Sequence, residues 1–165
     1  MGDGGWKWAE AESGASFVFL GSFRHAIDPK GRLSIPKRYL DSFPEFQARV
    51  FFGTRGLDPC LYLYPPDGWV RVVAQFRNLV NPGDPRHRAF IRKFLSTASE
   101  LPVDAAGRIL LPKSMREEVG IQDDVMILGV DDHLELWSPE HWAPDAATAA
   151  ADFPELGKQI FSVRA

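Results

Sequence analysis

The sequence has almost no cysteine, no long hydrophobic run and no excess of basic residues. Cys60, the only cysteine among 165 residues, cannot form a disulfide within the chain and is typical of a protein that folds in a reducing cytosol. No apolar run approaches the length of a membrane span, and the start of the chain shows no signal-peptide pattern, so we expect neither feature. The formal net charge is −3, so any nucleic-acid binding must come from a local basic patch.

Signatures of catalysis and of metal binding are lacking as well. The four histidines are scattered, and no spacing of cysteine and histidine suits zinc. No nucleophile–histidine–acid arrangement has support, and no glycine loop is suited to cradling phosphate. We therefore expect no enzyme, no cofactor, no metal site and no small-molecule substrate. An apolar content of 45% is enough for a core and excludes a wholly disordered chain.

One motif occurs twice and organises the rest of the chain. Asp28-Pro29-Lys30-Gly31-Arg32 recurs as Asp104-Ala105-Ala106-Gly107-Arg108, and each copy continues into an apolar strand, a Pro-Lys pair and a helical segment. The aspartate can accept hydrogen bonds from the backbone ahead of it, and the glycine tolerates a positive φ. Each motif therefore predicts a tight turn between two strands, and we expect the strands on either side of residues 28–31 to form a hairpin. A register this strict indicates an internal repeat.

The remaining pattern fits two copies of one unit joined by helices. Predicted strands and helices are 17–20, 23–27, 32–35, a helix from Pro36, 50–52, 61–64, a helix over 67–80, a helix over 85–97, 101–103, 108–111, a helix over 112–120, 125–128, 134–137 and a last helical stretch from Pro139. The first copy has three surplus residues, Thr54-Arg55-Gly56, which we place in the loop that joins its last two strands.

Neither copy is large enough to bury a core alone, so we expect the two to pack on each other about a pseudo-twofold axis. The predicted organisation is a flexible tail with Trp6 and Trp8 (1–16), a first repeat (17–69), connecting helices (70–97), a second repeat (98–142) and a C-terminal segment (143–165). Two interpretations of the paired helices stay open: they form a subunit interface, or they pack their apolar faces inside the monomer.

The paired turns, the helical connection and the Leu-x-Leu-aromatic-x-Pro-x-x-Trp ends at 61–69 and 134–142 resemble the MraZ family of bacterial transcriptional regulators. The resemblance implies an α+β fold of two AbrB-like swapped-hairpin units that form an intramolecular pseudo-twofold barrel. It also implies a cytoplasmic, nucleoid-associated protein that assembles into a ring of identical subunits. Its partner would be double-stranded DNA, at short repeated boxes upstream of division and cell-wall genes. The tail ahead of Phe17 departs from the family pattern.

Basic side chains gather in the first copy. Five of them lie between positions 24 and 38 with only Asp28 opposing them: Arg24, Lys30, Arg32, Lys37 and Arg38. In the second copy, the acids Asp104, Glu117 and Glu118 balance Arg108, Lys113 and Arg116. We therefore predict that the first turn binds DNA, with Arg32 at a base edge and the other four at phosphates. Arg108 is a candidate for a weaker second site or a subunit contact.

Structural explanations compete with these assignments. Asp28 and Arg32 can simply pair across their turn, as Asp104 and Arg108 can. For both aspartates and for Gly31 and Gly107 we favour turn construction over ligand contact. For Arg32 we favour DNA contact, and for Arg108 the structural ion pair. The alternative function is a protein-interaction module, antitoxin-like or an adaptor, that uses the same fold without binding promoters.

Overall fold

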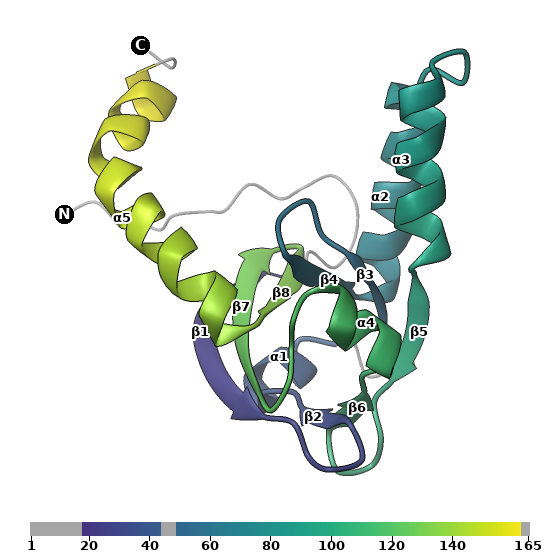
Figure 1. The fold of residues 1–165 in the computed structure, drawn as a ribbon, viewed down its shortest axis with the longest axis vertical. Coiled ribbons are helices and arrows are strands. Elements are labelled where there is room, and N and C mark those ends of the chain that lie inside the picture. Colours follow the sequence, from purple (N-terminus) through teal and green to yellow (C-terminus); the bar gives the residue numbers. More distant parts are fainter. Residues whose placement is uncertain (1–17, 44–48, 163–165) are drawn as a thin grey trace, which may run out of the picture.

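The computed structural model describes residues 18–43 and 49–162, so the predicted tail with Trp6 and Trp8 lies outside the described residues. The chain forms an α+β fold of antiparallel strands and helices (Figure 1). Its elements in order are β1 (Phe19–Ala26), β2 (Arg32–Ser34), α1 (Lys37–Leu40), β3 (Val50–Arg55), β4 (Cys60–Tyr64), α2 (Pro66–Leu79), α3 (Pro85–Ser96), β5 (Ser99–Pro102), β6 (Arg108–Leu110), α4 (Lys113–Glu118), β7 (Asp124–Asp131), β8 (His133–Trp137) and α5 (Pro139–Ser162). In the described part of the chain, no helix is both long and apolar enough to cross a membrane.

The two repeats exchange strands. β1 of the first repeat pairs with β7 of the second, and β5 of the second pairs with β3 of the first. Two further ladders join equivalent strands, β2 with β6 and β4 with β8. Exchanging the repeats maps this set of pairings onto itself, as the predicted pseudo-twofold relation requires.

This exchange corrects the expected pairing around the first turn. The chain does reverse at residues 28–31, where the N–H of Asp28 donates to the carbonyl of Arg32 and Ile27 and Leu33 form an isolated bridge, but β1 and β2 form no ladder with each other. The main sheet has the order β1-β7-β8-β4-β3-β5, with β2 and β6 as a separate two-stranded ribbon. Among the described residues the sheet therefore ends at β1 and β5 and does not close into the barrel that the resemblance implies.

The surplus of the first copy lies elsewhere than predicted. Thr54 and Arg55 are not in a loop: they are the last residues of β3 and pair with Tyr62 and Leu61 of β4. The β3–β4 and β7–β8 ladders are equivalent, and the pair Phe52–Tyr64 in the first corresponds to the pair Met126–Trp137 in the second. When the repeats are aligned on these pairs, most of the three surplus residues fall between α1 and β3. Thr54 is fully buried and its hydroxyl donates to the carbonyl of Phe94 at 2.5 Å. Tertiary contact therefore extends the strand beyond its apolar run.

Both repeats contribute to one hydrophobic core. Leu33 of β2 and Ile109 of β6 are fully buried and face each other at the centre of the ribbon. They belong to the same buried cluster as Leu61 and Leu63 of β4 and Leu134 of β8. A single repeat would expose these side chains, which explains why the two copies occur in one chain.

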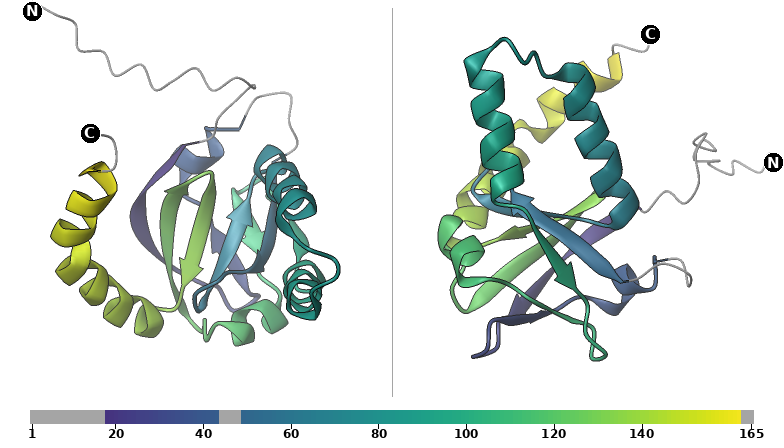
Figure 2. Two further views of the ribbon diagram at one scale, coloured as in Figure 1. Left: turned by 90° about the horizontal axis from the view of Figure 1, so that it is seen from above. Right: turned by 90° about the vertical axis from the view of Figure 1, so that its right-hand side faces the viewer.

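The long helices stand away from the sheet on two sides of the molecule. α2 and α3 form an antiparallel pair on one side, and α5 leaves β8 on the other (Figures 1 and 2). The base of the pair packs on the sheet through Trp69, which stacks on Phe52 and Phe94 at ring-centroid distances of 5.5 and 5.9 Å. α5 extends to Ser162, although Pro144 and Pro154 lie inside it.

Candidate nucleic-acid interface

Each repeated motif builds a turn that its aspartate holds together. In the first turn (residues 28–31), the Asp28 carboxylate accepts hydrogen bonds from the backbone N–H groups of Lys30 and Arg32, both at 2.9 Å. The N–H of Gly31 donates to the carbonyl of Asp28, and Gly31 has a φ of 81°. The predicted roles of aspartate and glycine in turn construction are therefore confirmed.

The second turn (residues 104–107) has the same construction. Asp104 accepts from the N–H groups of Ala106 and Arg108 at 2.9 Å, and Gly107 has a φ of 76°. Backbone hydrogen bonding from Arg108 lowers the pKa of Asp104, and bonding from Arg32 does the same for Asp28. Both carboxylates stay ionised at neutral pH, so each turn has a fixed negative charge at its base.

The arginine that ends each motif is paired and also accessible. Nε of Arg32 donates to Oδ2 of Asp28 at 2.6 Å, and Nε of Arg108 donates to Oδ2 of Asp104 at 3.0 Å. Each arginine side chain is 32% exposed. Within the described ranges, no protein acceptor is recorded for the two Nη groups of either guanidinium. The aspartate thus orients the guanidinium through Nε. The two Nη groups form the opposite edge of the guanidinium, and the ion pair leaves this edge available to a ligand.

The two turns lie at the same end of the molecule, away from the long helices (Figure 1). Each turn leads into one strand of the antiparallel β2–β6 ribbon, so the two turns lie at opposite ends of that short ribbon, in which Arg32 faces Leu110 and Ser34 faces Arg108. The turns also hold each other in place, because the N–H of Ile35 donates to Gly107 O and that of Leu111 donates to Gly31 O. The structure therefore brings Arg32 and Arg108 onto one end of the fold.

The other predicted residues differ in how free their charges are. Arg24 on β1 is 61% exposed and pairs with Asp124 at 2.6 Å. Lys37 pairs with Asp41 at 3.6 Å, and the guanidinium of Arg38 lies 6.0 Å from the ring centroids of Phe23 and Tyr39. Lys30 is exposed, and no ion pair is recorded for it among the described residues. Of the five first-copy cations, Lys30 therefore has the least compensated charge.

Sequence reasoning did not select Arg116, which the fold brings to the first turn. Its Nε donates to Leu111 O at 3.3 Å, and its Nη2 lies 3.4 Å from where a Cβ on Gly31 would be. Leu40 holds the equivalent place in the other repeat, 3.0 Å from the matching point on Gly107. The mismatch of Leu40 with Arg116 in the aligned repeats is the signal that could have identified it.

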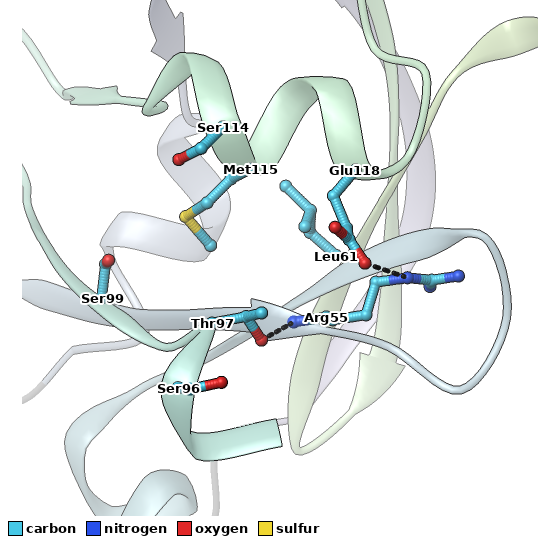
Figure 3. A pocket seen from close by; sticks show the side chains of 8 residues that line it. All are labelled: Arg55, Leu61, Ser96, Thr97, Ser99, Ser114, Met115 and Glu118. Atoms are coloured by element: carbon cyan, nitrogen blue, oxygen red, sulfur yellow. Dashed lines mark hydrogen bonds and ion pairs between the residues drawn. The ribbon is translucent and has the colours of Figure 1, made fainter. Parts of the chain in front are cut away.

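The expected charge balance of the second copy is also wrong in detail. Glu118 turns away from the turns and pairs with Lys93 at 2.6 Å and with Arg55 at 3.7 Å. The Glu118 and Arg55 side chains line a pocket of about 220 Å³, and Figure 3 shows the Glu118 carboxylate paired with Arg55 at one side of it. The charged groups of the pocket are thus already paired. Across the described ranges, no cluster of three or more histidine, cysteine, aspartate or glutamate residues is placed to hold a metal ion.

These features define a class of protein: two strand-exchanged repeats in one chain, with a pair of aspartate-ordered, arginine-bearing turns at one end. A family model described as MraZ protein matches residues 18–92 and 94–159. A transcriptional regulator MraZ from Thermomicrobium roseum is 41% identical over 143 residues, 87% of this chain and 97% of the relative. Transcriptional regulators MraZ from Heliobacterium modesticaldum and Lactiplantibacillus plantarum are 40% and 36% identical over 144 residues, 87% of this chain and 96% and 98% of those relatives.

The chain belongs to the MraZ family. The family is one of transcriptional regulators and not of enzymes, so the family resemblance of the sequence is confirmed.

Proposed function

We propose that this protein binds double-stranded DNA sequence-specifically and regulates transcription from promoters that carry short repeated boxes. The observation that carries the proposal is the pair of arginines, Arg32 and Arg108, each oriented by an aspartate at one end of the fold. A two-stranded ribbon fits the major groove, and an arginine there can grip guanine through two hydrogen bonds. The names of the relatives support the regulatory part of the proposal.

The two turns differ in the charge of the side chains around their arginines, so we expect them to contribute differently to DNA binding. Lys30 and Arg116 flank Arg32, whereas the uncharged Ala106 and Leu40 hold the equivalent places near Arg108. Cations beside the duplex neutralise phosphates and supply affinity that does not depend on sequence. The first turn is therefore the main contact, with Arg32 at a base edge, and Arg24, Lys30, Lys37 and Arg38 serve the backbone. Arg108 makes the weaker contact.

Assembly of several subunits would strengthen DNA binding that is modest for a single subunit. In the proposed function, identical subunits form a ring that presents several turns at fixed spacing, so tandem boxes bind by avidity. The proposed place of action is the nucleoid in the cytoplasm, and the proposed target is the gene cluster for division and cell-wall synthesis.

Binding of fluorescently labelled promoter duplexes tests the assignment of the first turn. We expect Arg32→Ala to weaken specific binding about tenfold or more, because one good bidentate contact contributes about 1–3 kcal/mol. Arg108→Ala should have a clearly smaller effect. Arg86→Ala is a matched control, because this exposed arginine begins α3 on the helical pair away from the turns. An equal or larger loss for Arg108→Ala would overturn the choice of the first turn, and no loss for either would overturn binding through the turns.

The second candidate is an antitoxin-like or adaptor protein that holds a protein partner. The description of the matching family favours it, because it likens these proteins to antitoxins. Recovery of a stoichiometric protein partner, with no binding of promoter DNA at any salt concentration, would place this candidate first.

A further inference from the structure

The two faces of the β2–β6 ribbon carry different side chains. Leu33 and Ile109 pair across the ribbon and are fully buried in the core. Successive residues of a strand point to opposite faces, and residues paired directly across a ladder point to the same face. The outer face therefore carries two further cross-strand pairs, Arg32 with Leu110 and Arg108 with Ser34. Each proposed DNA-contacting arginine thus has one neighbour across the ribbon.

Leu110 is an apolar side chain that faces solvent. It is 57% exposed, and among the exposed large apolar side chains of the described ranges it is the one that belongs to the ribbon. The equivalent place beside Arg108 holds Ser34, which is exposed and polar. The framework of the repeat therefore accepts a polar residue here, and packing of the ribbon does not require leucine. A single exposed leucine is ordinary on a protein surface, so its role depends on its surroundings.

Two guanidinium groups and a glycine surround Leu110. Its Cδ1 lies 3.7 Å from the point that a Cβ on Gly31 would occupy, and Nη2 of Arg116 lies 3.4 Å from the same point. Across the ribbon is Arg32, which is 32% exposed and held through Nε by Asp28. Gly31 has no side chain that could cover the leucine. A duplex bound by these cations would therefore bring its groove against Leu110 as well.

The apolar group that the bases of DNA present in the major groove is the C5 methyl of thymine, which apolar side chains read by contact. Directly opposed residues of antiparallel strands have Cα atoms about 4.5–5.5 Å apart, whereas successive base pairs are about 3.4 Å apart. When Arg32 binds a guanine, Leu110 therefore reaches a neighbouring base pair. We propose that Leu110 is a second specificity-determining residue and contacts a thymine methyl group beside the guanine bound by Arg32. The inference rests on the proposed function and adds one base to its recognition.

The same contact gives the two turns different base preferences. Ser34 stands beside Arg108, and a serine hydroxyl can donate to or accept from any base edge. The first turn therefore reads a guanine and an adjacent thymine, whereas the second turn has no apolar partner for a methyl group. Leu110 lies in the second repeat and serves the first turn because β2 and β6 pair across the repeats.

Base analogues test this contact with the full-length chain. The wild type selects its box from a library of short duplexes with a randomised centre. Each thymine of the selected box is then replaced in turn by deoxyuridine, which lacks only the C5 methyl group. We expect wild-type affinity for a single-box duplex to fall about fourfold at one position, next to a guanine, because this change corresponds to the loss of one buried methyl group.

Leu110→Ser gives the first turn the residue that stands beside Arg108. This variant should bind the thymine and deoxyuridine duplexes equally, whereas Leu110→Met, which keeps an apolar side chain, should keep the sensitivity to the methyl group. Leu57→Ser is the matched control, because Leu57 is 73% exposed in the loop between β3 and β4. It should behave like the wild type. Circular dichroism checks that each variant is folded, and Leu110→Ala replaces Leu110→Ser if the serine variant is not.

The outcomes separate this inference from the proposed function. A selected box without a thymine next to a guanine, a wild type that is insensitive to every replacement, or a Leu110→Ser variant that stays sensitive at the same position would each overturn the thymine contact alone. A wild type that selects no sequence from the library would refute sequence-specific binding itself.

Discussion

Arg116 is one of the residues that distinguish two similarly built turns. The two aspartate–arginine pairs have the same pattern of hydrogen bonds, and both arginine side chains are 32% exposed. The turns differ at Lys30, which corresponds to Ala106, and in the side chain that the opposite repeat places over each glycine, a guanidinium over Gly31 and a leucine over Gly107. Part of the asymmetry of the site therefore comes from the partner repeat and not from the segment that forms the turn.

Replacing Arg116 with leucine should place the same side chain over the glycine of both turns. We expect Arg116→Leu to leave the free energy of unfolding within about 1 kcal/mol of wild type, because Leu40 already occupies the equivalent place and surface substitutions have small effects. DNA binding should weaken similarly for all sequences, and the slope of log affinity against log salt should fall by about one, as expected for a lost phosphate contact. Anisotropy titrations at several salt concentrations measure both. Lys113→Leu, which removes an exposed cation from the same helix, is the control. A loss confined to the specific sequence would instead place Arg116 at a base.

At the scale of elements, the strand pairing depends on interactions that local sequence does not encode. The turns were predictable because aspartate and glycine at fixed positions impose a local geometry, and both glycines have the expected positive φ. The pairing partner of β1 was not predictable from local sequence, because its ladder with β7 joins residues from different repeats. Thr54 and Arg55 looked like loop residues for the same reason: contacts from α3 and β4 extend β3 to include them.

The candidate site was predictable to a similar extent. Lys30 and Arg32 could be selected from local charge, and the structure keeps both accessible at the turn. Arg116 could not be selected in this way, because its approach to Gly31 exists only after the repeats exchange strands. The compensation of Arg24 by Asp124 likewise depends on the ladder between β1 and β7.

His133 lies where β8 meets β4 and gives this junction a pH dependence. Its Nδ1 lies 2.7 Å from Oδ1 of Asp132 and its Nε2 lies 3.5 Å from Oε1 of Glu135. The imidazole packs on the rings of Tyr62 and Tyr64 at 4.6 and 5.1 Å. Burial disfavours its charged form, but the interactions with the two carboxylates outweigh burial and raise the pKa of His133 from 6.5 to about 9.

A pKa that is higher in the folded state means that protonation stabilises the fold. The contribution is fully present below pH 6.5 and is lost as the pH rises towards 9. We expect the free energy of unfolding to fall over this interval by up to about 3 kcal/mol. Urea unfolding at a series of pH values measures it. His133→Gln should be less stable at pH 6.5 and nearly flat up to pH 9, whereas His87→Gln, at an exposed position, should keep the wild-type profile. A wild-type stability that rises between pH 6.5 and 9 would contradict this account.

At the scale of the whole molecule, the two kinds of surface lie at opposite ends. The two turns proposed to bind DNA lie at one end, while α5 and the α2–α3 pair extend from the other (Figure 1). In the proposed ring, contacts made through the helices would therefore leave the turns uncovered. A net charge of −3 gives the chain no overall attraction for a polyanion, so the proposed binding of DNA must come from local basic patches.

This separation predicts that affinity depends on the rotational phase of two boxes. When their centres are one helical turn apart, about 10–10.5 base pairs, both boxes face the same side of the duplex. Two neighbouring subunits can then bind together, and affinity should exceed that for a single box by about 100-fold or more. Inserting about 5 base pairs puts the second box on the opposite side and should remove most of that gain. Equal wild-type affinity for the two spacings would show that the subunits bind independently, and regulation by a ring with several fixed turns would then be wrong.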